Sequence, residues 1–149
     1  MINHYLSPLG WIEYRLDKGY LTSMRFVDND NYHATEDQVS EQLRMYFEGT
    51  RHHFDLDIKF ENETEFQRSI WVELLKIPYG KTVSYQDLGK RISNPKAVRA
   101  IGQACKRNPI GIIVPCHRVI GKNQLLTGYS GKDYIHLKAA LLAHEKSHT

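Results

Sequence analysis

The chain reads IGIIVPCHR at positions 110–118, and this stretch organises the C-terminal half of the protein. Its first five residues are apolar and mostly β-branched, which is typical of a buried strand. The three residues after Pro115 bring a thiol, an imidazole and a guanidinium together. We therefore predict a buried strand over 110–114 that carries Cys116 to the edge of a basic site.

Two short helices are predicted upstream of this stretch. Ser84 indicates the start of a helix over 85–92. Asn94 as N-cap and Pro95 in the first helical position then predict a second helix that ends near Arg107. Two short helices joined by a tight turn are typical of a helix-turn-helix, and an αα-hairpin with only a packing role is the alternative.

Charge is distributed unevenly along the chain. The net charge of +3 combines 7 Lys/Arg and 14 Asp/Glu over residues 1–75 with 11 Lys/Arg and a single acid over residues 76–132. A basic block of this kind is expected of a protein that binds a polyphosphate, although a merely solvated basic surface is the alternative. Because the block contains the predicted helix pair, we favour DNA as the partner.

Composition excludes several classes of protein. A hydrophobic fraction of 41% and a mean hydropathy of −0.52 fit a globular chain. No apolar run approaches the length of a membrane span, and residues 1–5 lack the pattern of a signal peptide, so we expect a cytoplasmic protein. Two cysteines are too few for a disulfide framework or a cysteine-rich zinc site, and no metal is expected.

Cys116 has the neighbours of a reactive cysteine. The thiolate is the nucleophilic form, and a nearby histidine or arginine favours that anion. His117 and Arg118 follow directly, but contact between thiol and imidazole requires a turn or a bridging water. A packed core thiol is the alternative. That alternative is preferred for Cys105 on the predicted second helix, whereas the setting of Cys116 favours a nucleophile.

The N-terminal part alternates between strand and helix patterns. Apolar and charged residues alternate over 12–17, which predicts a strand, and a turn at 17–19 leads to a second strand over 21–27. A helix is then expected from an N-cap at Thr35 to Gly49, followed by a third strand over 54–60.

A further helix is capped by Thr64 and Gln67, and a closing helix is expected over 134–145. We therefore predict an α+β or α/β protein of two parts. The first, residues 1–62, has a small antiparallel sheet with helices; the second, residues 63–149, is mostly helical and binds DNA.

Four segments together resemble the O6-alkylguanine-DNA alkyltransferases, the methylated-DNA–protein-cysteine methyltransferases. They are IPYGKTVSY at 77–85, NPKAVRAIG at 94–102, NP at 108–109 and IVPCHRVI at 113–120. The resemblance is dense from about residue 66 to residue 145, and the first 60 residues match only in general pattern. It implies a ribonuclease H-like N-terminal fold and a winged-helix-like DNA-binding domain.

The resemblance implies DNA repair by irreversible, stoichiometric transfer of a methyl or alkyl group from O6-alkylguanine in duplex DNA to Cys116. O4-alkylthymine is a further candidate substrate. Each molecule would act once, as a monomer and without a cofactor. The zinc site of some relatives depends on N-terminal cysteines that this chain lacks.

The same resemblance assigns roles to five residues. Cys116 matches the alkyl acceptor, and His117 the histidine that takes the thiol proton through a water. Glu145 matches the acid that orients this histidine. Asn108 matches the asparagine that braces the turn below the cysteine, and Tyr85 the tyrosine that rotates the nucleotide and then donates a hydrogen bond to the purine.

DNA contacts are implied for the predicted helix pair. Arg99 matches an arginine finger that enters the stack where the base has flipped out, and small residues beside it permit close approach. The full expected DNA-binding set is Ser84, Tyr85, Ala97, Arg99, Ala100, Gly102 and Lys106. The expected base pocket is Cys116, Val119, Tyr129 and Ser130. The sequence departs from the family over 131–134, where Lys132 replaces a glycine and the stretch is about two residues longer.

Three other functions compete with alkyl transfer. A lesion-binding relative that only flags damage would lack the acceptor cysteine, so Cys116 argues against it. A helix-turn-helix regulator would bind a specific sequence without preferring damaged guanine. A cysteine hydrolase would leave the basic block unexplained.

Overall fold

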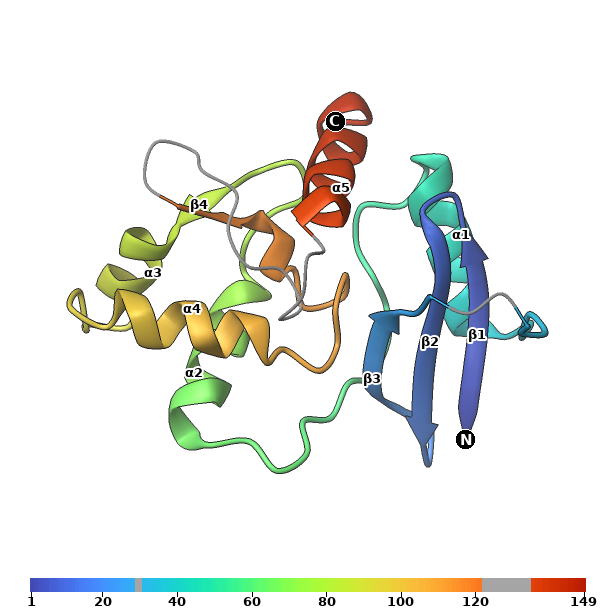
Figure 1. The fold of residues 1–149 in the computed structure, drawn as a ribbon, viewed down its shortest axis with the longest axis horizontal. Helices are drawn as coiled ribbons and strands as arrows, with labels where there is room; N and C mark the ends of the chain where they lie inside the picture. Colours follow the sequence, from blue (N-terminus) through green and yellow to red (C-terminus); the bar gives the residue numbers. More distant parts are fainter. Residues whose placement is uncertain (29–30, 122–134) are drawn as a thin grey trace.

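A computed structural model describes residues 1–28, 31–121 and 135–149, and Figure 1 shows two halves lying side by side. The N-terminal half is a three-stranded antiparallel sheet of β1 (Ile2–Ser7), β2 (Gly10–Asp17) and β3 (Tyr20–Phe26), with α1 (Gln38–Glu48) packed against it. This confirms the small N-terminal antiparallel sheet with helices.

The predicted β2–β3 hairpin is confirmed. Its turn places Lys18 at φ 50° and Gly19 at φ 87°, left-handed conformations that suit a tight hairpin. Ile12 and Tyr14 point into the core and are fully buried, as their alternation predicts. Strand β1 was not predicted; it adds to the sheet by pairing antiparallel with β2.

Helix α1 begins two residues later than predicted. Its N-cap is Asp37, whose carboxylate accepts a hydrogen bond from the Ser40 backbone 2.9 Å away, while the Ser40 hydroxyl accepts one from the Asp37 backbone. Thr35 instead accepts a hydrogen bond from His4 of β1, so a tertiary contact replaces its local capping role. The helix ends at Gly49, as predicted, with φ 83°.

Two predicted strands are wrong, and both lie along the free edge of β3. The segment 54–60 makes a single bridge, between Ile58 and Leu21, and the run 110–114 makes a single bridge, between Ile110 and Met24. The apolar run is buried, as predicted, but its backbone turns back on itself: Val114 donates to the Ile110 carbonyl 3.0 Å away. Turn hydrogen bonds therefore satisfy this buried backbone where strand pairing was expected.

The C-terminal half is helical. Its elements are α2 (Glu65–Leu74), α3 (Tyr85–Arg91), α4 (Val98–Lys106), the 3-10 turn η1 (Cys116–Arg118) and α5 (Ile135–Ser147), with a parallel pair of short strands, β4 (Val83–Ser84) and β5 (Val119–Ile120). The Thr64–Gln67 capping box is present at α2.

The helix pair α3–α4 differs from the prediction at its turn. Helix α3 begins at Tyr85 behind the N-cap Ser84, as expected. Helix α4 begins only at Val98, without a side-chain cap, because Asn94 and Pro95 belong to a turn in which Ala97 donates to the Asn94 carbonyl. The predicted start of the closing helix, Tyr134, lies outside the described residues.

One hydrophobic core runs through both halves and positions the site. It includes Met24 of β3, Tyr46 of α1, Ile70 of α2 and Leu141 of α5, together with Cys116. This core brings Tyr46 and Glu145, which are 99 positions apart in the chain, into contact with each other. Over the described ranges, no helix is long and apolar enough to cross a membrane.

Candidate active site

The turn η1 holds the predicted nucleophile inside the protein. Pro115 precedes the turn, and Cys116, His117 and Arg118 occupy it, with only 4%, 0% and 7% of their surfaces exposed. The Cys116 backbone donates to the Val114 carbonyl, and the Arg118 backbone donates to the Pro115 carbonyl. This tight turn sends three adjacent side chains in different directions, toward different partners.

Asn108 braces the turn below Cys116. Its Nδ2 donates to the Val114 carbonyl at 2.8 Å and to the Cys116 sulfur at 3.2 Å, and its Oδ1 accepts from the Ile110 backbone at 3.0 Å. Burial raises the pKa of the Cys116 thiol, while the Asn108 hydrogen bond and the charge of Lys138 act in the opposite direction. Burial therefore favours the thiol form of Cys116, and Asn108 and Lys138 partly offset this effect.

His117 and Glu145 form a buried pair. His117 Nε2 lies 2.6 Å from Glu145 Oε2, and neither side chain is exposed. Burial lowers the pKa of His117 below its ordinary value, against the opposing effect of Glu145. The carboxylate can only accept, so it selects the tautomer with a proton on Nε2. His117 Nδ1 is buried without a partner among the described residues and can accept a proton.

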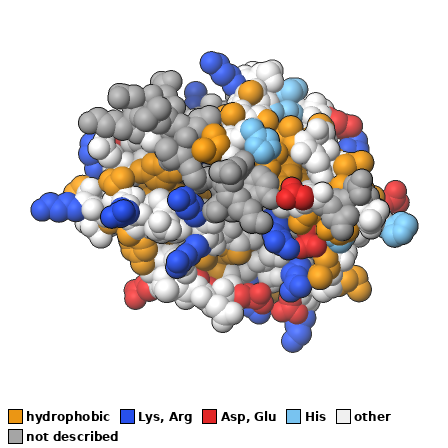
Figure 2. Space-filling model, viewed as in Figure 1, with side chains coloured by type: hydrophobic (Ala, Val, Ile, Leu, Met, Phe, Trp, Pro, Cys, Tyr) orange, Lys and Arg blue, Asp and Glu red, His pale blue; other side chains and the backbone are white. Residues whose placement is uncertain are grey.

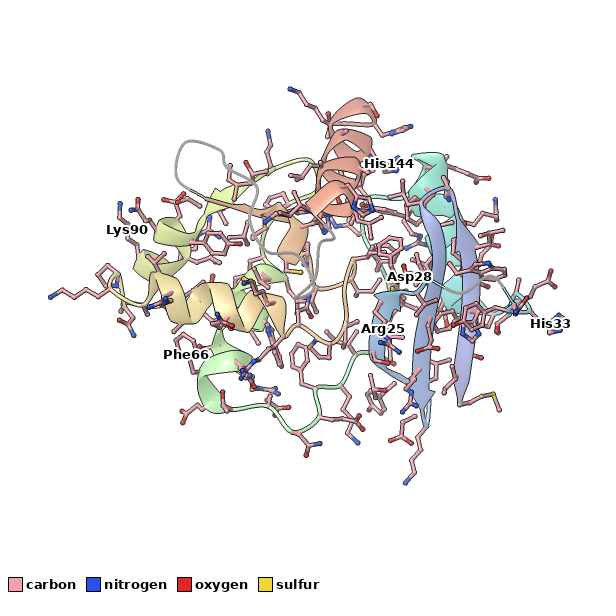
Figure 3. The ribbon with its side chains drawn as sticks, in the orientation of Figure 1. Arg25, Asp28, His33, Phe66, Lys90 and His144 are labelled. Atoms are coloured by element: carbon pink, nitrogen blue, oxygen red, sulfur yellow. The ribbon has the colours of Figure 1, made fainter. Side chains whose placement is uncertain are left out.

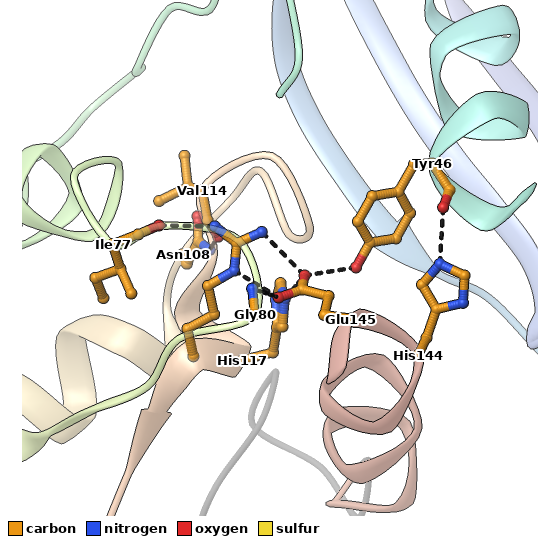
Figure 4. A network of polar contacts seen from close by, with 9 residues as sticks. Tyr46, Ile77, Gly80, Asn108, Val114, His117, His144 and Glu145 are labelled. Atoms are coloured by element: carbon orange, nitrogen blue, oxygen red, sulfur yellow. Dashed lines mark hydrogen bonds and ion pairs between the residues drawn. The ribbon is translucent and has the colours of Figure 1, made fainter. Parts of the chain in front are cut away.

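Glu145 is the centre of the polar network drawn in Figure 4. Arg118 donates from Nε to Oε1 at 2.8 Å and from Nη2 to Oε2 at 2.9 Å. The Tyr46 hydroxyl donates to Oε2 at 2.7 Å, and the Gly80 backbone donates to Oε1 at 3.2 Å. Burial alone would raise the pKa of Glu145, but His117 and Arg118 outweigh it and hold that pKa well below its usual range.

Arg118 also fixes the loop before β4. Its Nη1 donates to the Ile77 carbonyl at 2.8 Å, and its guanidinium lies 5.6 Å from the centre of the Tyr79 ring. Arg118 and Glu145 are both buried, and a buried ion pair is costly unless its remaining polar atoms are hydrogen-bonded. The contact with the Ile77 carbonyl meets part of this requirement. The resemblance had assigned no role to Arg118, Tyr46 or Gly80.

Lys138 is a buried site residue that sequence reasoning missed. Only 1% of its surface is exposed, and its Nζ lies 3.5 Å from the Tyr85 hydroxyl and 5.6 Å from the centre of that ring. Burial lowers the pKa of Lys138, while Cys116 and Cys105 act in the opposite direction. Its spacing was a usable signal, because Lys138, Leu141 and Glu145 are three and four residues apart and share one face of α5.

The expected DNA-binding residues lie along α3 and α4. Arg99, Ala100 and Lys106 are exposed, while Ser84, Ala97 and Gly102 are partly exposed. A methyl group added at Gly102 would meet open space, so no other part of the described protein covers α4 at this position. Tyr85 differs from the others, because it is 92% buried and faces Lys138.

Basic side chains surround this helix pair. Lys90, Arg91, Lys96 and Arg107 are also exposed. Figure 2 shows lysine and arginine side chains over this half of the face drawn, and Figure 3 shows Lys90 extending outward from α3. The exposed lysines and arginines of α3, α4 and the segments beside them therefore form a basic surface over this helix pair.

The expected base pocket is only partly described. Val119 is fully buried immediately after η1, in the short strand beside β4. Tyr129 and Ser130, and the atypical stretch 131–134, lie outside the described residues. In the part of the chain that the structure describes, no cluster of histidine, cysteine or acidic residues is arranged to hold a metal ion.

The fold and the site together define a protein that presents a basic helix pair beside a buried cysteine, histidine and glutamate. Residues 65–147, more than half of the chain, match the family described as 6-O-methylguanine DNA methyltransferase, DNA binding domain. The chain belongs to this 6-O-methylguanine DNA methyltransferase family, which confirms the resemblance found in its motifs.

The similar proteins cover from 72% to 99% of the chain. The constitutive methylated-DNA–protein-cysteine methyltransferase of Bacillus subtilis is 41% identical over 144 residues, which cover 95% of this chain and 81% of the relative. A methylated-DNA–protein-cysteine methyltransferase of Methanosarcina acetivorans is 51% identical over 109 residues, which cover 72% of this chain and 67% of the relative. The crystal structure of Mycobacterium tuberculosis OGT in complex with DNA is 40% identical with a TM-score of 0.88, covering 99% of this chain and 94% of that one.

Proposed function

We propose that this protein repairs DNA by transferring a methyl or alkyl group from O6-alkylguanine in duplex DNA to Cys116. The observation that carries the proposal is the buried His117–Glu145 pair beside a cysteine braced by Asn108, in a chain of the 6-O-methylguanine DNA methyltransferase family. The thioether formed on Cys116 is chemically inert, so each molecule acts once. O4-alkylthymine is a further candidate substrate.

The reaction begins with proton transfer inside the site. His117 Nδ1 takes the thiol proton, through a water in the mechanism that the resemblance implies, and the imidazolium is stabilised by Glu145. The thiolate attacks the alkyl carbon. A carbon–sulfur bond forms as the carbon–O6 bond breaks, and the electron pair of that bond leaves with the guanine.

The leaving guanine needs a proton or a hydrogen bond as its charge develops. Tyr85 supplies this donor in our assignment. Its hydroxyl accepts a hydrogen bond from the Lys138 ammonium, with the two atoms 3.5 Å apart. The resemblance assigns Cys116, Val119, Tyr129 and Ser130 to the base pocket, of which Tyr129 and Ser130 lie outside the described residues.

Reaching O6 requires the nucleotide to leave the stack, at a cost of roughly a few kcal/mol. Arg99, exposed early in α4, would occupy the space left by the flipped base. The small residues Ala97, Ala100 and Gly102 would let α4 approach the backbone, with Ser84 and Lys106 contacting phosphates.

The finer architecture is part of the same proposal. We assign residues 1–62 to a ribonuclease H-like domain and residues 63–149 to a winged-helix-like domain. The start of α2 immediately after its N-cap Thr64 supports the boundary. We expect the protein to act as a monomer in the cytoplasm, without a cofactor.

Mass spectrometry tests the function directly. The protein is mixed with excess duplex carrying one O6-methylguanine, and intact and peptide masses are measured. We expect a gain of one methyl group per molecule, on the Cys116 peptide. Cys116→Ala should gain none while it retains duplex affinity to within about twofold, because that thiol contributes little surface.

If the wild-type protein gains no methyl group, its DNA binding distinguishes the competing functions. Tight lesion binding without a mass gain would favour a protein that only flags damage. Absence of both transfer and lesion preference would favour a regulator. Methyl transfer by Cys116→Ala would refute Cys116 as the acceptor.

A further inference from the structure

We propose that Tyr46, on the N-terminal helix α1, is a positioning residue for the alkyl-transfer site: its hydroxyl holds the Glu145 carboxylate against His117 and tunes how strongly His117 binds a proton. The inference rests on the proposed function of Cys116. It extends the working site into the N-terminal half, outside the stretch 65–147 that matches the family.

Tyr46 and His117 share one carboxylate oxygen. The Tyr46 hydroxyl lies 2.7 Å from Glu145 Oε2, and His117 Nε2 lies 2.6 Å from the same atom. Arg118 Nη2 is a third donor to Oε2, at 2.9 Å. Because an oxygen divides its negative charge among its donors, the Tyr46 hydroxyl reduces the charge that Oε2 offers to His117.

Tyr46 is held firmly in this orientation. It follows Val39 and Leu43 on the buried face of α1, and none of its own surface is exposed. His144, one residue before Glu145, donates from Nε2 to the Tyr46 carbonyl at 2.7 Å. Figure 4 shows both contacts joining α5 to α1, and Figure 3 places His144 at this junction. The Tyr79 ring also contacts Tyr46 edge-on, with centres 6.0 Å apart.

The phenol keeps its proton and acts as a donor. Burial, assisted by the charge of Glu145, raises the pKa of Tyr46 well above its ordinary value. A neutral donor of this kind stabilises the carboxylate without adding a charge to the site. It also leaves His117 Nδ1, on the opposite side of the imidazole, available to the thiol.

Removal of the hydroxyl should therefore strengthen the hold of Glu145 on the imidazolium. Among the described residues, the charged groups that act on His117 are Glu145 and Lys138 from α5 and Arg118 from its own turn, and Tyr46→Phe leaves all three in place. With one donor fewer on Oε2, the pKa of His117 should rise by about half a unit or more. The acid limb of the pH–rate profile for methyl transfer should move upward with it.

The experiment compares Tyr46→Phe with Tyr14→Phe in the full chain. Tyr14 is also fully buried in the N-terminal half and donates to the Asp37 carboxylate at 2.8 Å, so its variant loses an equivalent hydrogen bond away from the cysteine. His117 is titrated by imidazole nitrogen NMR, and single-turnover transfer is measured against pH. We expect both readouts to shift in Tyr46→Phe and neither to shift in Tyr14→Phe.

A ring-fluorinated tyrosine at position 46 should shift the pKa of His117 in the opposite direction. It keeps the shape of the side chain but donates more strongly, so the pKa of His117 should fall. A merely structural role for Tyr46 predicts an unshifted His117 in both replacements, and that result would overturn the proposal. The NMR titration needs no DNA, so it reports on Tyr46 even if the wild-type protein gains no methyl group and the proposed function fails.

Discussion

Asn108 donates a hydrogen bond directly to the sulfur of Cys116, with Nδ2 and Sγ 3.2 Å apart. The same nitrogen also holds the Val114 carbonyl, and the amide oxygen accepts from the Ile110 backbone. One side chain thus stabilises the turn that carries the thiol and favours the thiolate that the reaction needs. Structural and chemical effects of this residue can be separated by choosing the substitution.

Asn108→Asp should slow transfer by raising the pKa of the thiol. Aspartate keeps the oxygen that accepts from Ile110, but it removes the donor to both the Cys116 sulfur and the Val114 carbonyl. It also adds a negative charge beside the thiol, so the pKa of Cys116 should rise further. We expect transfer at neutral pH to fall at least about tenfold. Reaction of Cys116 with iodoacetamide as a function of pH measures the thiol pKa. An unchanged thiol profile would contradict this account.

Lys138→Met should have opposite effects on activity and stability. The buried ammonium lowers the pKa of Cys116, so its loss should slow transfer several-fold at neutral pH. Burying an ammonium opposes folding, and an apolar side chain of similar length should leave the free energy of unfolding unchanged or higher. Denaturant unfolding and single-turnover kinetics check both effects. A parallel loss of stability and rate would indicate a structural role alone.

Arg99→Ala should impair lesion repair without changing the cysteine. Arg99 is exposed on α4, so reaction of Cys116 with iodoacetamide should match the wild type. Transfer from duplex DNA should fall at least about tenfold, because the flipped nucleotide loses its replacement in the stack. Lys106→Ala is the matched control; it should lose only salt-dependent affinity, roughly one phosphate contact. If the two variants lose transfer activity equally, Arg99 contacts only phosphate and does not replace the flipped base.

Acid should destabilise the protein in two stages. The pKa of His117 is lowered in the folded state, so below about pH 6.5 the unfolded chain binds a proton that the folded site excludes, and stability falls. The pKa of Glu145 is also lowered, so its stabilisation is present above about pH 4.3 and is lost as pH falls further.

Urea unfolding between pH 8 and pH 3 tests these two stages. Glu145→Gln should weaken the second stage, to which Glu13 and Asp87 also contribute through their lowered pKa values. The variant should start from a lower stability, by about 3–5 kcal/mol, because Arg118 is left buried without its carboxylate. A wild-type stability that stays constant from pH 8 to pH 5 would contradict a buried neutral His117.

Local signals in the sequence predicted several elements correctly. The Thr64–Gln67 capping box, the left-handed Gly49 and the turn at Lys18 all involve partners within a few residues. The motif around Cys116, taken together with the segments at 77–85, 94–102 and 108–109, identified the family. The caps and the turn could be predicted from residues a few positions apart, whereas the family needed all four segments.

Tertiary structure decided what depended on distant partners. Thr35 lost its capping role to a contact with β1, and the buried run 110–114 turned back on itself because its backbone found partners in its own turn and in Met24 of β3. The completion of the site was decided in the same way. Lys138 could be anticipated only from its spacing on α5. Tyr46 reaches Glu145 from 99 residues away, a contact that exists only because both halves fold around one core.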